Sequence, residues 1–232
     1  MTDIAAPADL PARIPVFPLR GAILLPRATL PLNLFEPRYV AMIDDCIGSS
    51  RILGIIQPER VGGLAGGLAT EQDESPTGKH VGLRRVGCAG RVTAYQEVPD
   101  GRVVITLTGI CRFTVLSETP SAKPYRICEV TYDPFLADFE RDADQSGVNR
   151  EQLLAVLKRY LEANNYKADW RSIEQAPSEH LVNSLSIMSP YGPEEKQALL
   201  EAADVKARAD VLIALAEMEL AAGDGGAGTT LQ

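Results

Sequence analysis

Residues 13 to about 134 carry short apolar runs separated by Pro, Gly and Asp, which is typical of β-strands joined by turns. In the clearest run, Val103, Ile105 and Leu107 alternate with a more polar set, so one face of that strand is expected to point inward. The pattern predicts six strands, at residues 14–19, 29–35, 51–57, 81–98, 102–116 and 125–132.

Turn residues and one helical stripe complete this half. Pro99-Asp100-Gly101 predicts a hairpin before the fifth strand, because Pro fixes φ and Gly accepts a positive φ. Gly109 interrupts the alternation and predicts a bulge or bend that lets one long strand serve two sides of a barrel. A helix is predicted from Pro37 to Gly48, since apolar residues recur there at helical spacing.

From residue 134 the apolar period becomes helical, which predicts a helical bundle. Ser178 and Asp204 are candidate N-caps, and Pro193 is placed to open a further helix. We therefore expect an α+β chain with the following parts: a flexible tail at 1–12, a β-rich subdomain at 13–133 with a flexible loop at 58–80, a helical subdomain at 134–222 and a flexible tail at 223–232.

Composition narrows the class of protein. The 232 residues are 45% hydrophobic and 23% charged, which are ordinary values for a folded globular chain. No apolar run approaches the ~20 residues of a membrane-spanning helix, and residues 1–12 contain no Lys or Arg to begin a secretory signal. We therefore expect a cytoplasmic protein without membrane attachment. The four cysteines form no Cys-x-x-Cys pair and are expected to be reduced and buried.

Several motifs, in order, resemble the Lon protease N-terminal (substrate-binding) domain family. They are Ile14-Pro-Val-Phe-Pro-Leu19, Leu30-Pro-Leu-Asn-Leu-Phe-Glu-Pro-Arg-Tyr39, Val86-Gly-Cys-Ala-Gly-Arg91, Leu107-Thr-Gly-Ile-Cys-Arg-Phe113, Pro124-Tyr-Arg126 and the stretch from Met188 to Leu200. The resemblance implies a six-stranded PUA-like pseudo-barrel with one helix, followed by an α-helical bundle. In the full protease an ATPase module and a Ser-Lys peptidase module follow, so a chain ending at Gln232 is expected to be a stand-alone form without them.

Motifs for catalysis are missing from the sequence. Gly78-Lys79 is followed by His80 and lacks the spacing of a phosphate-binding loop, and no serine stands in a recognisable nucleophile setting. The acidic stretch at 142–147 begins like a calcium loop but has Leu153 where a bidentate Glu is needed. We expect no enzyme activity, no cofactor and no metal. A hydrolase with an unrecognised site remains an alternative, which converging lysine or carboxylate groups would reveal.

Charge argues against nucleic acid as the partner. Residues 13–131 hold 14 basic and 11 acidic side chains, a net +3, whereas residues 132–232 hold 9 and 18, a net −9. This lacks the concentrated basic stripe that binding to phosphates demands. Because PUA-like barrels include RNA binders, a module that binds RNA or a small ligand, with Arg84, Arg85 and Arg91 as a small basic face, stays as the alternative function.

Recognition of polypeptide is the remaining function, and it needs an accessible apolar surface or a sheet edge. The candidate surface is the Pro- and Gly-punctuated segment after the first strand, with the residues Leu19, Arg20, Ile23, Leu24, Leu25 and Arg27. The alternative is that these apolar groups pack into the barrel. The family-motif residues Phe35, Glu36, Pro37, Arg38 and Tyr39 are expected to be structural. We expect unfolded or damaged polypeptides as partners, and a separate Lon-type protease that this chain supplies or regulates.

Overall fold

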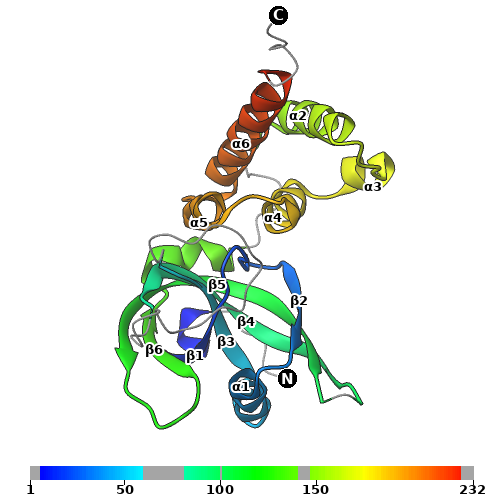
Figure 1. Cartoon of the computed structure of the whole chain (residues 1–232). Coiled ribbons are helices and arrows are strands. Elements are labelled where there is room, and N and C mark those ends of the chain that lie inside the picture. The colour runs from blue at the N-terminus through cyan, green and yellow to red at the C-terminus, as the bar shows by residue number, and fades with distance from the viewer. Residues whose placement is uncertain (1–5, 60–80, 100, 141–146, 226–232) are drawn as a thin grey trace, which may run out of the picture. The chain divides into compact units, whose positions relative to one another are not determined.

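The computed structural model describes residues 6–59, 81–99, 101–140 and 147–225, without the side chains of 223–225 (Figure 1). The chain forms two compact units. Unit 1 contains Met1–Arg141 and Tyr191–Leu200, and unit 2 contains Asp142–Pro190 and Glu201–Gln232. Most of the predicted loop at 58–80 and the ends of both predicted tails lie outside the described residues.

Unit 1 holds the sheet that the sequence predicts. Its strands are β1 (Arg13–Pro18), β2 (Thr29–Leu34), β3 (Ile52–Pro58), β4 (Leu83–Glu97), β5 (Val103–Thr119) and β6 (Arg126–Thr131). Its helices are α1 (Pro37–Ile47), the 3-10 helices η1 (Pro7–Asp9) and η2 (Asp133–Phe139), and α5 (Pro193–Glu201) up to Leu200. The six strands and the helix after Pro37 are confirmed, with ends that differ by at most a few residues.

The strands form one mixed sheet in the order β2-β5-β4-β3-β1-β6, with a further pairing between β5 and β6 (Figure 1). The first half of β5 pairs with β2 and β4, and its second half pairs with β6. The register shifts beside Gly109, where the sequence predicts a bulge. The sheet is therefore a PUA-like pseudo-barrel. It is not a closed barrel, because β2 lies next to β5 at one end of the strand order.

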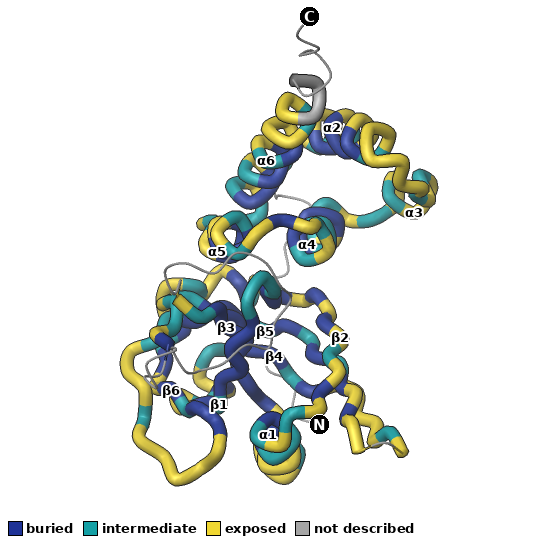
Figure 2. The backbone as a smooth tube through the Cα atoms, in the orientation of Figure 1, coloured by how far each residue is buried: buried dark blue, intermediate teal, exposed yellow. Residues whose placement is uncertain are grey.

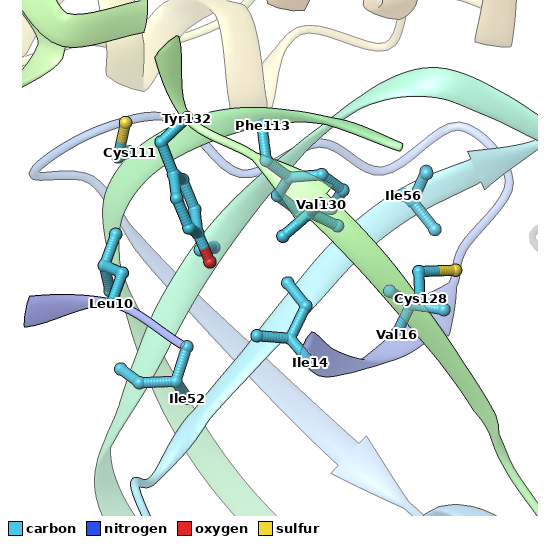
Figure 3. Packing of buried hydrophobic residues seen from close by; sticks show 11 residues of the cluster. Leu10, Ile14, Val16, Ile52, Ile56, Cys111, Phe113, Cys128, Val130 and Tyr132 are labelled. Carbon is cyan, nitrogen blue, oxygen red and sulfur yellow. The ribbon is translucent and has the colours of Figure 1, made fainter. Parts of the chain in front are cut away.

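The core of unit 1 fills the inside of the curled sheet (Figure 3). Phe113 of β5 belongs to this cluster, and a Cβ on Gly87 or Gly54 would lie within 2.8 Å of its ring. The glycines on β3 and β4 therefore make room for this ring. Leu10 belongs to the same cluster, so this residue of the predicted flexible tail at 1–12 packs against the sheet.

Unit 2 is made of helices α2 (Arg150–Ala163), α3 (Trp170–Gln175), α4 (Ser178–Met188) and α6 (Val205–Gly225). The side chain of Arg150 donates to the carbonyls of Ile173 and Glu174 and to the Ser178 hydroxyl, which ties the start of α2 to α3 and α4. Asp204 caps α6 as predicted, since its carboxylate accepts from the Ala207 N–H at 2.7 Å.

The unit boundaries differ from the predicted division at residue 134. Both η2 and α5 belong with the sheet, although their residues fall in the predicted helical subdomain. A buried amide pair holds α5 to the sheet. Gln57 of β3 donates to the Gln197 side chain at 3.0 Å and to the Pro193 carbonyl at 2.9 Å. Gln197 in turn donates to the Val86 carbonyl of β4.

Candidate functional site: an accessible sheet face in unit 1

The predicted polypeptide-binding segment lies in the core. Ile23, Leu24 and Leu25 are each 1% exposed or less, and Leu19 is also buried. A surface that binds a partner needs accessible side chains, so the expected exposure of this segment is wrong. The alternative, packing into the barrel, is the arrangement that the structure has.

Two strand glycines explain this burial. A Cβ on Gly90 would lie 2.5 Å from Leu24, and a Cβ on Gly109 would lie 2.0 Å from the Leu25 carbonyl oxygen. The segment therefore lies directly on the backbones of β4 and β5. Hydrogen bonds fix it there, because Arg27 N–H donates to the Gly109 carbonyl and Gly109 N–H donates to Ala28.

The two arginines of the predicted surface are placed differently. Arg27 is exposed and has a positive φ of 64°, which is uncommon for a residue with a side chain. Its guanidinium donates to the Asp138 carbonyl at 2.6 Å, so it anchors the segment to η2. Arg20 is half-buried. Neither arginine borders an exposed apolar patch of segment 19–25, because the apolar side chains of that segment are buried.

The family-motif residues surround the entry into α1. Arg38 forms an ion pair with Glu36 at 2.8 Å and lies over the Tyr39 ring, 4.6 Å from its centroid. Tyr39 is buried and stacks on Phe17 of β1, with ring centroids 4.1 Å apart. Pro37 opens the helix. These contacts fasten α1 to the sheet. Phe35 differs from its neighbours, because 59% of it is exposed.

An accessible face that the sequence analysis missed extends from Phe35 across the sheet. Paired residues of neighbouring strands point to the same side, and the register pairs Asn33 with Val104 and Val104 with Gln96. Exposed and buried positions alternate along β2 (Figure 2). The outward set is Thr29, Pro31, Asn33, Phe35, Arg91, Thr93, Ala94, Gln96, Val104, Thr106 and Thr108. We call this set the β2–β5–β4 face.

The β2–β5–β4 face carries no Asp, Glu or Lys, and its one charged residue is Arg91 of β4, which is half-buried and pairs with Thr108. Its inward counterparts Val103, Ile105 and Leu107 are core residues. The alternation of residues 103–108 gave the signal for this face, but its extent depends on the strand register, which a sequence does not give. A partly apolar surface with a single charged residue suits contact with another polypeptide.

Several other ionisable groups of unit 1 form ion pairs or are buried. Arg84 of the possible basic face forms an ion pair with Glu194 of α5. Arg112 and Asp138 form a buried ion pair with Nη2 and Oδ1 2.8 Å apart. Burial raises the pKa of Cys46 to about 12 and that of Cys128 to about 11, and it also raises the pKa of Cys88 and Cys111. Thiols held protonated in this way are poor nucleophiles.

Within residues 6–59, 81–99, 101–140 and 147–225, no three His, Cys, Asp or Glu side chains converge as metal ligands. No helix in these ranges combines the length and apolar character that crossing a bilayer requires.

Comparison with known proteins identifies the family. The model of the ATP-dependent protease La (Lon) substrate-binding domain matches residues 13–217 of this chain. The chain belongs to this family. The Lon substrate-binding domain thus accounts for both units, from the start of β1 into α6.

Curated relatives are Lon proteases. The Lon protease of Flavobacterium johnsoniae is 24% identical over 206 residues, which are 87% of this chain and 23% of the relative. Lon protease 2 of Sorangium cellulosum is 29% identical over 214 residues, which are 89% of this chain and 25% of the relative. The chain thus spans about a quarter of the length of these proteins.

Solved structures show the same fold. The Lon N-terminal domain protein from Xanthomonas campestris has a TM-score of 0.58 at 23% identity, over 87% of this chain and 97% of that chain. The N-terminal domain of Mycobacterium avium complex Lon protease also has a TM-score of 0.58, at 17% identity, over 88% of this chain and 98% of that chain. The predicted fold class is confirmed by this likeness.

Proposed function

We propose that this chain is a non-catalytic module that binds unfolded or damaged polypeptides in the cytoplasm and either presents them to a separate Lon-type protease or regulates one. The observation that carries the proposal is membership of the Lon substrate-binding domain family over residues 13–217. The contact surface in this proposal is the β2–β5–β4 face, with Phe35 as its anchor.

The chemistry of the face supports this choice. Unfolded chains expose apolar side chains, and burying an exposed aromatic ring against them contributes more than any other side chain on this face could. Phe35 has 59% of its surface available for that contact. The β2 and β5 residues of the face are uncharged and its one charged residue, Arg91, lies on β4, so an apolar segment can dock over β2 and β5 without desolvating an ion.

Fluorescence anisotropy of labelled, unfolded casein titrated with the full chain tests the proposal. Phe35→Ser should weaken binding by about 5- to 30-fold, as for an aromatic anchor worth about 1–2 kcal/mol. Leu116→Ser is the matched control, because Leu116 is also 59% exposed and lies on β5 outside the face. It should bind casein like the wild type.

Two results would count against the proposal. Absence of saturable binding to casein by the wild type would remove polypeptide recognition as the function. Equal weakening of casein binding by both substitutions would show that the contact is not centred on Phe35. A parallel titration against a purified Lon protease tests the partner, and saturable binding there is the expected result.

A further inference from the structure

The end strand β2 has one open edge. Among the described strands it pairs only with β5, whereas β6 at the other end of the strand order is closed by pairing with both β1 and β5. An open edge offers backbone N–H and C=O groups that can pair with another extended chain.

The strand register decides which residues of β2 direct their backbone outward. Gly109 N–H donates to the Ala28 carbonyl, so these two residues form a hydrogen-bonded pair. Such pairs recur at every second residue of an antiparallel ladder, so the backbones of Leu30, Leu32 and Leu34 face β5. Those of Thr29, Pro31 and Asn33 then face the open edge.

The hydrogen bonds between β4 and β5 lead to the same assignment of which residues bond to which strand. Val98 N–H donates to the Arg102 carbonyl, and counting by twos along the ladder brings the backbones of Val104 and Thr106 toward β4. The Thr93 hydroxyl also donates to the Thr106 carbonyl at 3.1 Å. The alternate residues of β5 are therefore the ones bonded to β2, as the Ala28 contact requires.

The open edge has more acceptors than donors. Thr29, Pro31 and Asn33 each supply a carbonyl, but Pro31 has no N–H, so only Thr29 and Asn33 donate. Two β2 edges placed together would share this shortage of donors. An ordinary polypeptide has an N–H at every residue except proline and can satisfy all three carbonyls.

The side chains beside this edge are uncharged. Pro31, Asn33 and Phe35 point outward, and Leu32 on the other side of the strand is half-buried. A strand added at the edge would place its own alternate side chains next to these groups. A charged residue there would lose hydration without gaining a partner from β2.

We propose that the β2 edge binds an extended, uncharged segment of an unfolded polypeptide as an added strand. This inference rests on the proposed function and names the binding mode and the chemistry of the bound segment. Pro31 limits the pairing, because it removes the central donor and leaves the edge a poor template for self-association.

Substitutions at the edge test the inference through the backbone. Pro31→Ala supplies the missing N–H and should tighten binding of a short fluorescein-labelled peptide of alternating valine and serine by about 2- to 12-fold, the worth of one hydrogen bond. Pro120→Ala, an exposed proline outside β2, is the matched control and should change nothing.

Two substitutions at Asn33 distinguish binding through the backbone N–H from binding through the side chain. Asn33→Pro removes an edge donor without removing a bond to β5 and should weaken binding several-fold, whereas Asn33→Ala keeps the N–H and should bind like the wild type. The N-methylated form of the same peptide should not bind. A urea titration of each variant establishes that it is folded, and if Asn33→Pro is not, Pro31→Ala and the N-methylated peptide decide.

The outcomes separate this inference from the proposed function. If the wild type binds casein but Pro31→Ala leaves peptide binding unchanged, the edge is not the site and the proposed function stands. If the wild type binds neither casein nor peptide, the proposed function fails. If Pro31→Ala forms dimers in sedimentation without tighter peptide binding, the edge accepts a second copy and the inferred occupant is wrong.

Discussion

Removal of one partner of the buried ion pair between Arg112 and Asp138 should strongly destabilise unit 1. Arg112 is 2% exposed and Asp138 is 7% exposed. The carboxylate accepts hydrogen bonds from the Arg112 backbone N–H at 2.9 Å and from Nε and Nη2 at 3.0 and 2.8 Å. The guanidinium also donates to the Leu200 carbonyl and lies 4.5 Å from the Phe135 ring centroid.

Asp138→Ala would leave the guanidinium buried without its carboxylate. Removing one partner of such a pair costs about 3–5 kcal/mol, since the remaining charge keeps its desolvation cost. The backbone N–H of Arg112 would also lose its acceptor, which places the expected loss at the upper end, about 4–5 kcal/mol. Asp133→Ala is the control, because Asp133 is exposed on the same 3-10 helix. It should cost less than about 0.5 kcal/mol.

Hydrogen exchange of β5 amides measures this loss in unit 1 itself, because it reports the free energy of opening at each site. The double variant Arg112→Met, Asp138→Leu replaces the pair with apolar groups and should recover most of the stability. A loss below about 1 kcal/mol for Asp138→Ala would contradict this expectation, because it would mean that water reaches the guanidinium in the folded state.

Three further outcomes are expected. Gly109→Ala would place a Cβ 2.0 Å from the Leu25 carbonyl oxygen and should lower the unfolding free energy in urea by about 2–3 kcal/mol; no loss would mean that segment 19–28 moves aside freely. Burial lowers the pKa of Lys196 from 10.5 to about 8, so the unfolded state holds more protons between these values and stability from this group rises with pH. Lys196→Met should remove that rise, of about 1–3 kcal/mol, and an unchanged pH profile would contradict it. The four cysteines should react with a thiol reagent at pH 8 only after unfolding, and rapid reaction of any of them in the folded chain would contradict their burial.

Local patterns predicted the elements of this chain well. Alternation in residues 103–108 and the turn residues before them indicated the β4–β5 hairpin, and Gly101 has the predicted positive φ of 84°. Pro37 marked the start of α1, and Asp204 marked the start of α6. Each of these signals acts over a few neighbouring residues, so the sequence contains it directly.

The site depended on contacts between distant residues. Whether Leu24 and Leu25 are covered is decided by Gly90 and Gly109, which leave space on strands more than 60 residues away. The same holds for α5, whose helical pattern gives no hint that Gln197 pairs with Gln57. Apolar character alone therefore suggested a surface where the structure has a core.

Hydrogen exchange of the full chain, with and without saturating unfolded casein, locates polypeptide binding on the molecule. We expect slower exchange of backbone amides in residues 29–35, which comprise β2 and the exposed Phe35, and no change in residues 116–119 at the far end of β5. Slower exchange confined to other parts of the chain would contradict the assignment of polypeptide binding to the β2–β5–β4 face.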